Sequence, residues 1–137
     1  MKQITVISRR NPDASVVVAE VLGQAGVNID TIDVETVDET TLVVLTVDRY
    51  DDALCALQRA ELEALTEDVI LVVVEDRPGS AAAIGKRLLD AGIHLRSLRI
   101  LRRQNDRAIV GVAVDRTDRA MELLKDVLVS EAAYRQR

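Results

Sequence analysis

The chain has almost no aromatic side chains, since its 137 residues include two tyrosines and neither phenylalanine nor tryptophan. Aliphatic side chains and alanine must therefore fill the core, which favours sheets covered by helices. Proteins that bind nucleic acid usually stack bases on aromatic rings and neutralise phosphates with clustered lysine and arginine. The lack of aromatics and a net charge of -5 argue against a nucleic-acid partner.

Cysteine and histidine are equally scarce, because Cys55 and His94 are the only residues of their kinds. A lone cysteine cannot form an internal disulfide, and this pair excludes most nucleophile–base arrangements and metal-ligand clusters. We therefore expect no enzymatic activity, no cofactor and no bound metal. Cys55 lies within a helical pattern, where we expect it to be buried or half-buried.

Long apolar runs are also missing. No run is long enough to span a bilayer, and the N-terminus has no charged and then apolar leader. We expect a soluble cytoplasmic protein with no membrane partner.

What the sequence does contain is an internal repeat. Residues 11–34 align with residues 77–100 at a constant offset of 66 residues, so that Pro12 matches Pro78 and Gly26 matches Gly92. Self-similarity of this kind indicates duplicated structural units. We expect two domains, residues 1–68 and 69–137, each so small that the two pack together or the chain forms a homodimer.

Hydrophobic periodicity predicts strand, helix, hairpin, helix and strand in each repeat, which is a ferredoxin-like βαββαβ order. The fold class is α+β, with antiparallel sheets that carry their helices on one face. Asp51 is the expected N-cap of the second helix, and residues 69–74, apolar on both faces, are expected to form a central strand. The expected elements are residues 4–8, 17–25, 31–35, 42–47, 53–62 and 65–69 in the first repeat, and residues 69–75, 81–89, 97–101, 108–114, 119–128 and 129–134 in the second.

Two short motifs flank the first helix of the second repeat. Asp76-Arg77-Pro78-Gly79 precedes it and Ala91-Gly92-Ile93-His94-Leu95 follows it. Together they resemble the signature of the ACT domain, a "D-R-P-G" turn and a "G-I/V-N-I" step. The first repeat keeps the step as Gly26-Val27-Asn28-Ile29 but departs at the turn, Arg10-Asn11-Pro12-Asp13. The whole chain resembles small stand-alone tandem ACT proteins.

This resemblance implies a regulatory function. ACT domains bind small ligands, most often amino acids, at interfaces between two such domains, and they regulate an attached or partner enzyme allosterically. The expected function is therefore a non-catalytic protein that binds an amino acid between its ACT repeats. One alternative is a regulatory or scaffolding subunit that binds a metabolic enzyme in trans without a small ligand. Another is an unrecognised enzyme on the same scaffold.

The turn before a helix is suited to a carboxylate, because its backbone amides are unpaired and the helix dipole is positive there. Gly79 would let a ligand approach the main chain closely. Asp13 stands where a glycine is expected and would repel an anion, so we expect one competent site or none. A structural turn at Pro78-Gly79 is the alternative. The candidate ligand-binding residues are Asp76, Arg77, Gly79, Ser80 and His94 in the second repeat, and Arg10, Asn11, Asp13 and Asn28 in the first, where the resemblance implies that Asn28 reaches a ligand at a neighbouring turn.

Charge differs between the repeats. Residues 1–68 carry 5 basic and 14 acidic side chains, whereas residues 69–137 carry 13 and 9. At matched positions of the second strand, Asp30 and Asp33 in one repeat correspond to Arg96 and Arg99 in the other. The resemblance implies side-by-side pairing of these strands, so we expect the four residues to form an interface that selects repeat one with repeat two. A solvated strand rim is the alternative.

Overall fold

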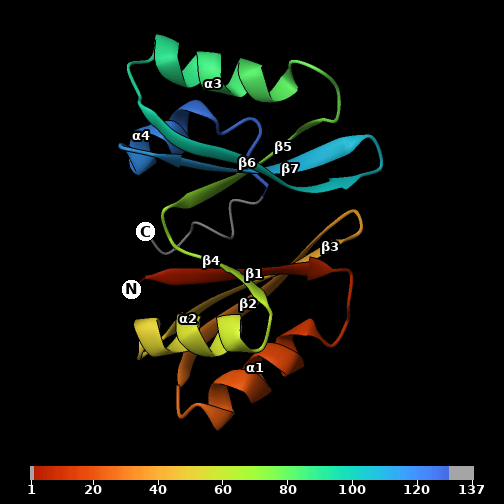
Figure 1. Cartoon of the computed structure of the whole chain (residues 1–137), viewed down its shortest axis with the longest axis vertical. Coiled ribbons are helices and arrows are strands. Elements are labelled where there is room, and N and C mark those ends of the chain that lie inside the picture. The colour runs from red at the N-terminus through yellow and green to blue at the C-terminus, as the bar shows by residue number, and fades with distance from the viewer. Residues whose placement is uncertain (1, 130–137) are drawn as a thin grey trace. The chain divides into compact units, whose positions relative to one another are not determined.

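The computed structural model describes residues 2–129, and the chain divides into two compact units (Figure 1). Unit 1 ends at Glu67 and unit 2 begins at Asp68. Each unit has its own sheet and its own hydrophobic core. None of the helices in the described range is both long enough and apolar enough to cross a membrane.

Unit 1 has the predicted βαββαβ order. Its sheet order is β2-β3-β1-β4, and all neighbouring strands are antiparallel. Both helices lie on one face of this sheet (Figure 1), so the ferredoxin-like prediction is confirmed for unit 1. Its elements are β1 (Gln3–Arg9), α1 (Ala14–Gln24), β2 (Ile29–Val37), β3 (Thr40–Val47), α2 (Tyr50–Arg59) and β4 (Glu63–Leu65).

The core of unit 1 follows from strand alternation. On β3, Val43 and Leu45 point towards the helices, where Leu22 of α1 and Leu57 of α2 are fully buried. Each such aliphatic side chain contributes about 1.5–3 kcal/mol when it leaves water. The aliphatic core predicted from the missing aromatics is therefore present.

Unit 2 repeats the first five elements. Its three-stranded sheet has the order β5-β7-β6, again antiparallel, and its core contains Ile84 and Leu88 of α3. The hairpin turn between β6 and β7 places Asn105 and Asp106 at positive φ, as a tight hairpin requires. The elements are β5 (Val69–Glu75), α3 (Ser80–Asp90), β6 (Leu95–Gln104), β7 (Arg107–Val114) and α4 (Thr117–Leu123).

The end of unit 2 differs from the prediction. Helix α4 ends at Leu123 and not at residue 128, because the chain turns there and Arg87 of α3 donates a 2.8 Å hydrogen bond to the Leu123 carbonyl. The turn brings residues 127–129 beside β5, through a single bridge between Val72 and Leu128. Most of the predicted closing strand, residues 129–134, lies outside the described residues.

The prediction that residues 69–74 form a central strand is confirmed in part, because β5 is an outer strand of the three-stranded sheet but its other side meets residues 127–129 at the Val72–Leu128 bridge. The central strand is β7, whose neighbours are β5 and β6. The connection from β5 to β6 contains the helix α3, so these two strands need not be neighbours in the sheet. β7, which follows β6 in a hairpin, pairs between them. The apolar residues of β5 still alternate, with Ile70 and Val72 in the helix-facing core and Leu71 buried in the opposite row.

Two predictions for α2 are also wrong. The helix begins at Tyr50 with Arg49 at the N-cap, so Asp51 lies in the first turn and makes no capping hydrogen bond. The acidic side chain still suits the positive end of the helix dipole. Cys55 is exposed, because the buried face passes through Ala53 and Leu57 and position 55 lies on the opposite side of the helix.

The helix-facing core predicts a sharp contrast between two adjacent leucines of α3. Leu88 is fully buried, whereas Leu89 is 70% exposed. We expect Leu88→Ala to lower the free energy of unfolding by about 2–5 kcal/mol, and Leu89→Ala to change it by less than about 0.5 kcal/mol. Urea denaturation followed by circular dichroism measures both. Equal effects of the two substitutions would contradict this assignment of the α3 faces.

Candidate functional site

The turn between β5 and α3, residues 76–79, is fixed mainly by backbone hydrogen bonds. The amide of Asp76 donates to the Asp106 carbonyl at 2.8 Å, which ties the turn to the β6–β7 hairpin. Within the turn, the Ser80 amide donates to Arg77 at 3.3 Å and the Ala83 amide donates to Gly79 at 2.9 Å. The turn therefore has a defined shape without using its side chains.

Gly79 is the N-cap of α3 and has a φ of 90°, a conformation that side chains disfavour. A Cβ at this position would meet no atom within 4 Å. The glycine is thus explained by backbone conformation, and not by crowding within the unit. Within residues 2–129, the amides of Gly79, Ala81 and Ala82 have no hydrogen-bond partner.

Charged side chains of the turn are paired with near neighbours. Asp76 forms an ion pair with Arg103 of β6, and its side chain is only 28% exposed. Arg77 contacts Glu75 through Nε and Oε2 at 3.0 Å. Arg103 was missed by the sequence reasoning, although its place near the end of the arginine-rich strand β6 brings it beside the turn. Its guanidinium neutralises the Asp76 carboxylate at this turn.

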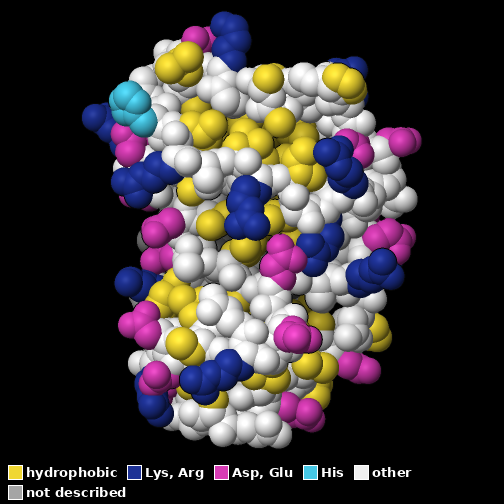
Figure 2. All heavy atoms as spheres, in the orientation of Figure 1, with side chains coloured by type: hydrophobic (Ala, Val, Ile, Leu, Met, Phe, Trp, Pro, Cys, Tyr) yellow, Lys and Arg dark blue, Asp and Glu magenta, His cyan; other side chains and the backbone are white. Residues whose placement is uncertain are grey.

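Two hollows border this turn. One, of about 360 Å³, has an apolar lining from Ile100 of β6 and Val110 of β7, and Arg103 at its side. The other, of about 730 Å³, lies towards Arg87 and Val127. Figure 2 shows hydrophobic side chains exposed between the positions of α3 and β6. Both volumes are within the usual range of small-molecule sites.

Arg87 defines the far side of the second hollow. Its guanidinium binds both carboxylate oxygens of Asp126, at 2.8 and 3.2 Å. This hydrogen bonding holds the pKa of Asp126 below its ordinary value. Together with the bond to the Leu123 carbonyl, it fixes the segment after α4 against α3.

The first turn, residues 10–13, has the same backbone framework. Arg10 donates to Glu39 at 2.7 Å, Ala14 to Asn11 at 3.2 Å and Val17 to Asp13 at 3.0 Å. Its side chains differ, because the Asn11 Oδ1 accepts a 2.9 Å hydrogen bond from the Asp13 amide. Asp13 therefore keeps a negative φ of -97° without a glycine. Its amide, which corresponds to the open amide of Gly79, is occupied by the protein itself.

Asn28 and His94 occupy equivalent positions, and their backbones make the same contact. The Asn28 amide donates to Asp48 Oδ1 at 3.0 Å and the Asp48 amide donates back to the Asn28 carbonyl at 3.1 Å. His94 and Asp115 repeat this pair at 3.0 and 3.2 Å. These contacts clamp the loop after one helix to the loop before the next.

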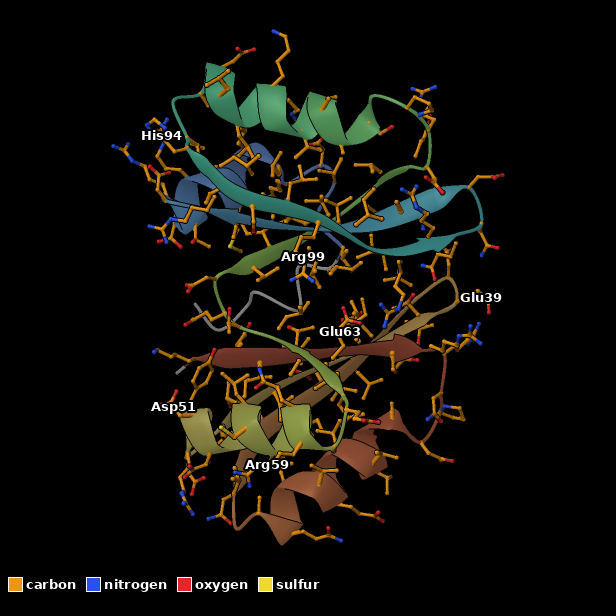
Figure 3. All side chains as sticks on the ribbon, in the orientation of Figure 1. Glu39, Asp51, Arg59, Glu63, His94 and Arg99 are labelled. Carbon is orange, nitrogen blue, oxygen red and sulfur yellow. The ribbon has the colours of Figure 1, made fainter. Side chains whose placement is uncertain are left out.

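The structure does not bring His94 to the turn of its own unit. His94 is exposed and lies at the end of α3 opposite to the turn (Figure 3). The Asn28 side chain is already used within unit 1, since its Nδ2 donates to Asp48 Oδ2 at 3.0 Å. That hydrogen bond is the main reason why the pKa of Asp48 is lowered. The remaining candidates, Asp76, Arg77, Gly79 and Ser80, lie together.

The predicted interface residues lie on two edge strands. Asp30 and Asp33 are exposed on β2, the edge of the sheet of unit 1. Arg96 and Arg99 are exposed on β6, the edge of the sheet of unit 2. Both strands are thus edges of their sheets in the described range, as side-by-side pairing would require.

Residues 2–129 contain no group of three or more His, Cys, Asp or Glu side chains that could bind a metal ion.

No protein-family model and no curated protein matches the sequence. Among solved structures, a protein from Bacteroides thetaiotaomicron is 21% identical with a TM-score of 0.48, over 96% of this chain and 92% of that one. The ligand-free regulatory subunit of aspartate kinase from Thermus thermophilus is 20% identical with a TM-score of 0.42, over 92% and 91%. The acetolactate synthase small subunit from Thermotoga maritima is 14% identical with a TM-score of 0.39, over 94% and 89%. Because these TM-scores are below 0.5, the fold assignment depends on the strand order within each unit.

The clamp in unit 1 predicts a change in one pKa. Because the pKa of Asp48 is lowered in the folded state, its bond to Asn28 stabilises unit 1 above the ordinary carboxyl pKa, and this stabilisation is lost as the pH falls through the folded pKa. We expect Asn28→Ala to raise the Asp48 pKa, measured by NMR titration of the carboxyl carbons. Asp126, which depends on Arg87, is the internal control and should not change. An unchanged Asp48 pKa would rule out the side-chain bond as its cause.

Proposed function

We propose that this chain is a non-catalytic regulatory protein that binds an amino acid at the turn before α3. The contrast between the two turns carries this proposal. Both have the same three backbone hydrogen bonds, but Asn11 fills the amide of Asp13 in the first turn, whereas the amide of Gly79 is without a partner among the described residues. The second turn therefore has donors available for a ligand.

An α-carboxylate is the group that suits these donors. The amides of Gly79, Ala81 and Ala82 lie at the N-terminus of an 11-residue helix, where the helix dipole favours an anion. Arg77, which contacts Glu75, supplies a positive charge at the rim, and its side chain is 71% exposed. Ser80 adds a hydroxyl at the first helical position.

The other parts of an amino acid also find partners here. Glu75 and Asp76, which contact Arg77 and Arg103, line the smaller hollow, and their remaining carboxylate oxygens suit an α-ammonium group. Ile100 and Val110 form an apolar floor for a side chain. A volume of about 360 Å³ suits a ligand of this size.

The regulatory part of the proposal comes from the resemblance to ACT domains. In that family a bound amino acid changes the activity of an enzyme, and a second ACT repeat completes the pocket. Here we propose that the controlled enzyme is a separate metabolic enzyme and that the regulator acts as a homodimer in the cytoplasm.

The internally satisfied first turn favours a second candidate function. In the first turn the Asp13 amide already donates a hydrogen bond to Asn11 Oδ1, so no ligand is required to satisfy it. If neither repeat binds a ligand, the second candidate function is that of a regulatory or scaffolding subunit, which binds its enzyme through protein contacts alone.

The proposal predicts that charge at position 79 decides ligand binding. A ligand at 100 times its Kd raises the free energy of unfolding by about 2.7 kcal/mol. We expect at least one of the twenty amino acids to stabilise the protein in a thermal-shift screen. Gly79→Asp should abolish the shift, because its carboxylate repels that of the ligand, while Gly79→Asn should keep it.

The Asn variant is the matched control, since Asn and Asp have nearly the same shape and both tolerate the left-handed conformation of residue 79. Isothermal titration calorimetry of the best amino acid then gives the Kd for each variant. A screen without any stabilising amino acid at millimolar concentrations would overturn the proposal and favour the partner-binding subunit. Unchanged binding in both variants would place the ligand elsewhere, and equal loss of binding in both would assign the loss to a change of backbone conformation at residue 79.

A further inference from the structure

The two units differ in chemistry at one pair of strand residues beside the turn that precedes the first helix. In unit 1, Ser8 of β1 lies opposite Thr41 of β3. In unit 2, Val74 of β5 lies opposite Ala108 of β7. The positions are equivalent, because Ser8 and Val74 are each the last but one residue of their strands, and Thr41 and Ala108 are each the second. Two hydroxyl groups in unit 1 therefore correspond to two apolar side chains in unit 2.

The threonine hydroxyl of unit 1 has a partner in its own turn. Thr41 Oγ1 accepts a hydrogen bond from the Asn11 amide at 3.1 Å, and Thr41 is only 2% exposed. In unit 2 the matching amide, that of Arg77, donates to the Glu75 carbonyl at 3.0 Å. The turn of unit 2 thus needs no polar side chain at the position of Ala108.

This difference makes one wall of the smaller hollow apolar. Val74 and Ala108 line the hollow together with Ile100 and Val110. Ala108 is 2% exposed and Ile100 is 42% exposed, so the wall extends from a buried position to an open one. A polar group placed against this wall would give up hydrogen bonds to water and gain none from the side chains there, whereas a hydrocarbon group gains free energy by leaving water.

The charged residues that also line the hollow are paired with one another. Asp76 forms an ion pair with Arg103, and Glu75 forms one with Arg77. A charged ligand side chain would have to compete with these pairs. An apolar ligand side chain leaves them in place, and the remaining carboxylate oxygens stay available to the α-ammonium group.

We propose that the ligand of the smaller hollow is an amino acid with an apolar side chain, and that Val74, Ala108 and Ile100 select it by contact with that side chain. This inference rests on the function proposed above, which provides the sites for the α-carboxylate and α-ammonium groups. Valine and threonine have nearly the same shape, but only threonine brings a hydroxyl to the apolar wall. We expect valine to bind about 10- to 100-fold more tightly than threonine, and leucine to exceed asparagine in the same sense.

Isothermal titration calorimetry of the intact chain with valine, leucine, threonine and asparagine measures this selection. The decisive variant is Ala108→Ser, which adds a hydroxyl to the wall where unit 1 has one. We expect it to weaken valine binding and to lower the ratio of valine to threonine affinity about tenfold, because the added hydroxyl can pair with that of threonine. Loss of folding alone would weaken both ligands equally and leave this ratio unchanged.

The matched control is Ala113→Ser on the same strand. Ala113 lies between the core residues Val112 and Val114 and therefore on the helix-free face, away from the hollow. Its substitution should change neither Kd. Circular dichroism checks that each variant is folded, and Val74→Thr, which keeps the side-chain shape and adds a hydroxyl, gives the same test if Ala108→Ser does not fold.

The outcomes separate this inference from the function on which it rests. Tightest binding of a polar or charged amino acid, abolished by Gly79→Asp, would overturn the inference and leave the proposed function in place. No binding of any of the twenty amino acids would overturn that function, and the inference with it. A ratio of valine to threonine affinity that is the same in the parent chain, Ala108→Ser and Val74→Thr would show that this wall does not select the side chain.

Discussion

Both units depend on a central strand that is paired on both edges. β3 lies between β1 and β2, and β7 lies between β5 and β6. Every residue of β3 is buried, which means that aliphatic side chains on this strand provide much of the volume that aromatic rings provide in other proteins. The chain connections then leave the first strand of each hairpin on the outside. The same arrangement places the turn before the first helix of each unit beside the turn of its β-hairpin.

Much of this architecture could be predicted from the sequence, because the repeat fixed the order of elements and the hydrophobic alternation fixed their faces. The errors have local causes. Asp51 was expected to cap α2, but the N-cap is Arg49, two residues earlier, and the helix starts at Tyr50. Cys55 was expected to be buried or half-buried, as free cysteines usually are, whereas its position around the helix exposes it. The end of α4 depends on a distant arginine, Arg87, which no local pattern could indicate.

The candidate site was predicted in part. The residues of the turn lie together as expected, since they are adjacent in sequence. The partner of Asp76 is Arg103, a tertiary contact set by the register of β6, and the sequence has no signal that selects one arginine of that strand. His94 lies at the far end of the 11-residue helix α3, as its matched position after the helix implies, and its role in ligand binding stays a prediction.

The two repeats also differ in how their sheets end. In unit 1, β4 pairs with β1 over three residues, whereas residues 127–129 meet β5 at one bridge and are held there by Arg87 and Asp126. Local opening of a structure takes the free energy of the few contacts that must break. In the described part of unit 2, residues 127–129 can separate from β5 while the rest of the core stays folded. The backbone amide of Val73, which donates to the Val127 carbonyl at 2.8 Å, then exchanges with solvent deuterium sooner than the β5 amides paired with β7.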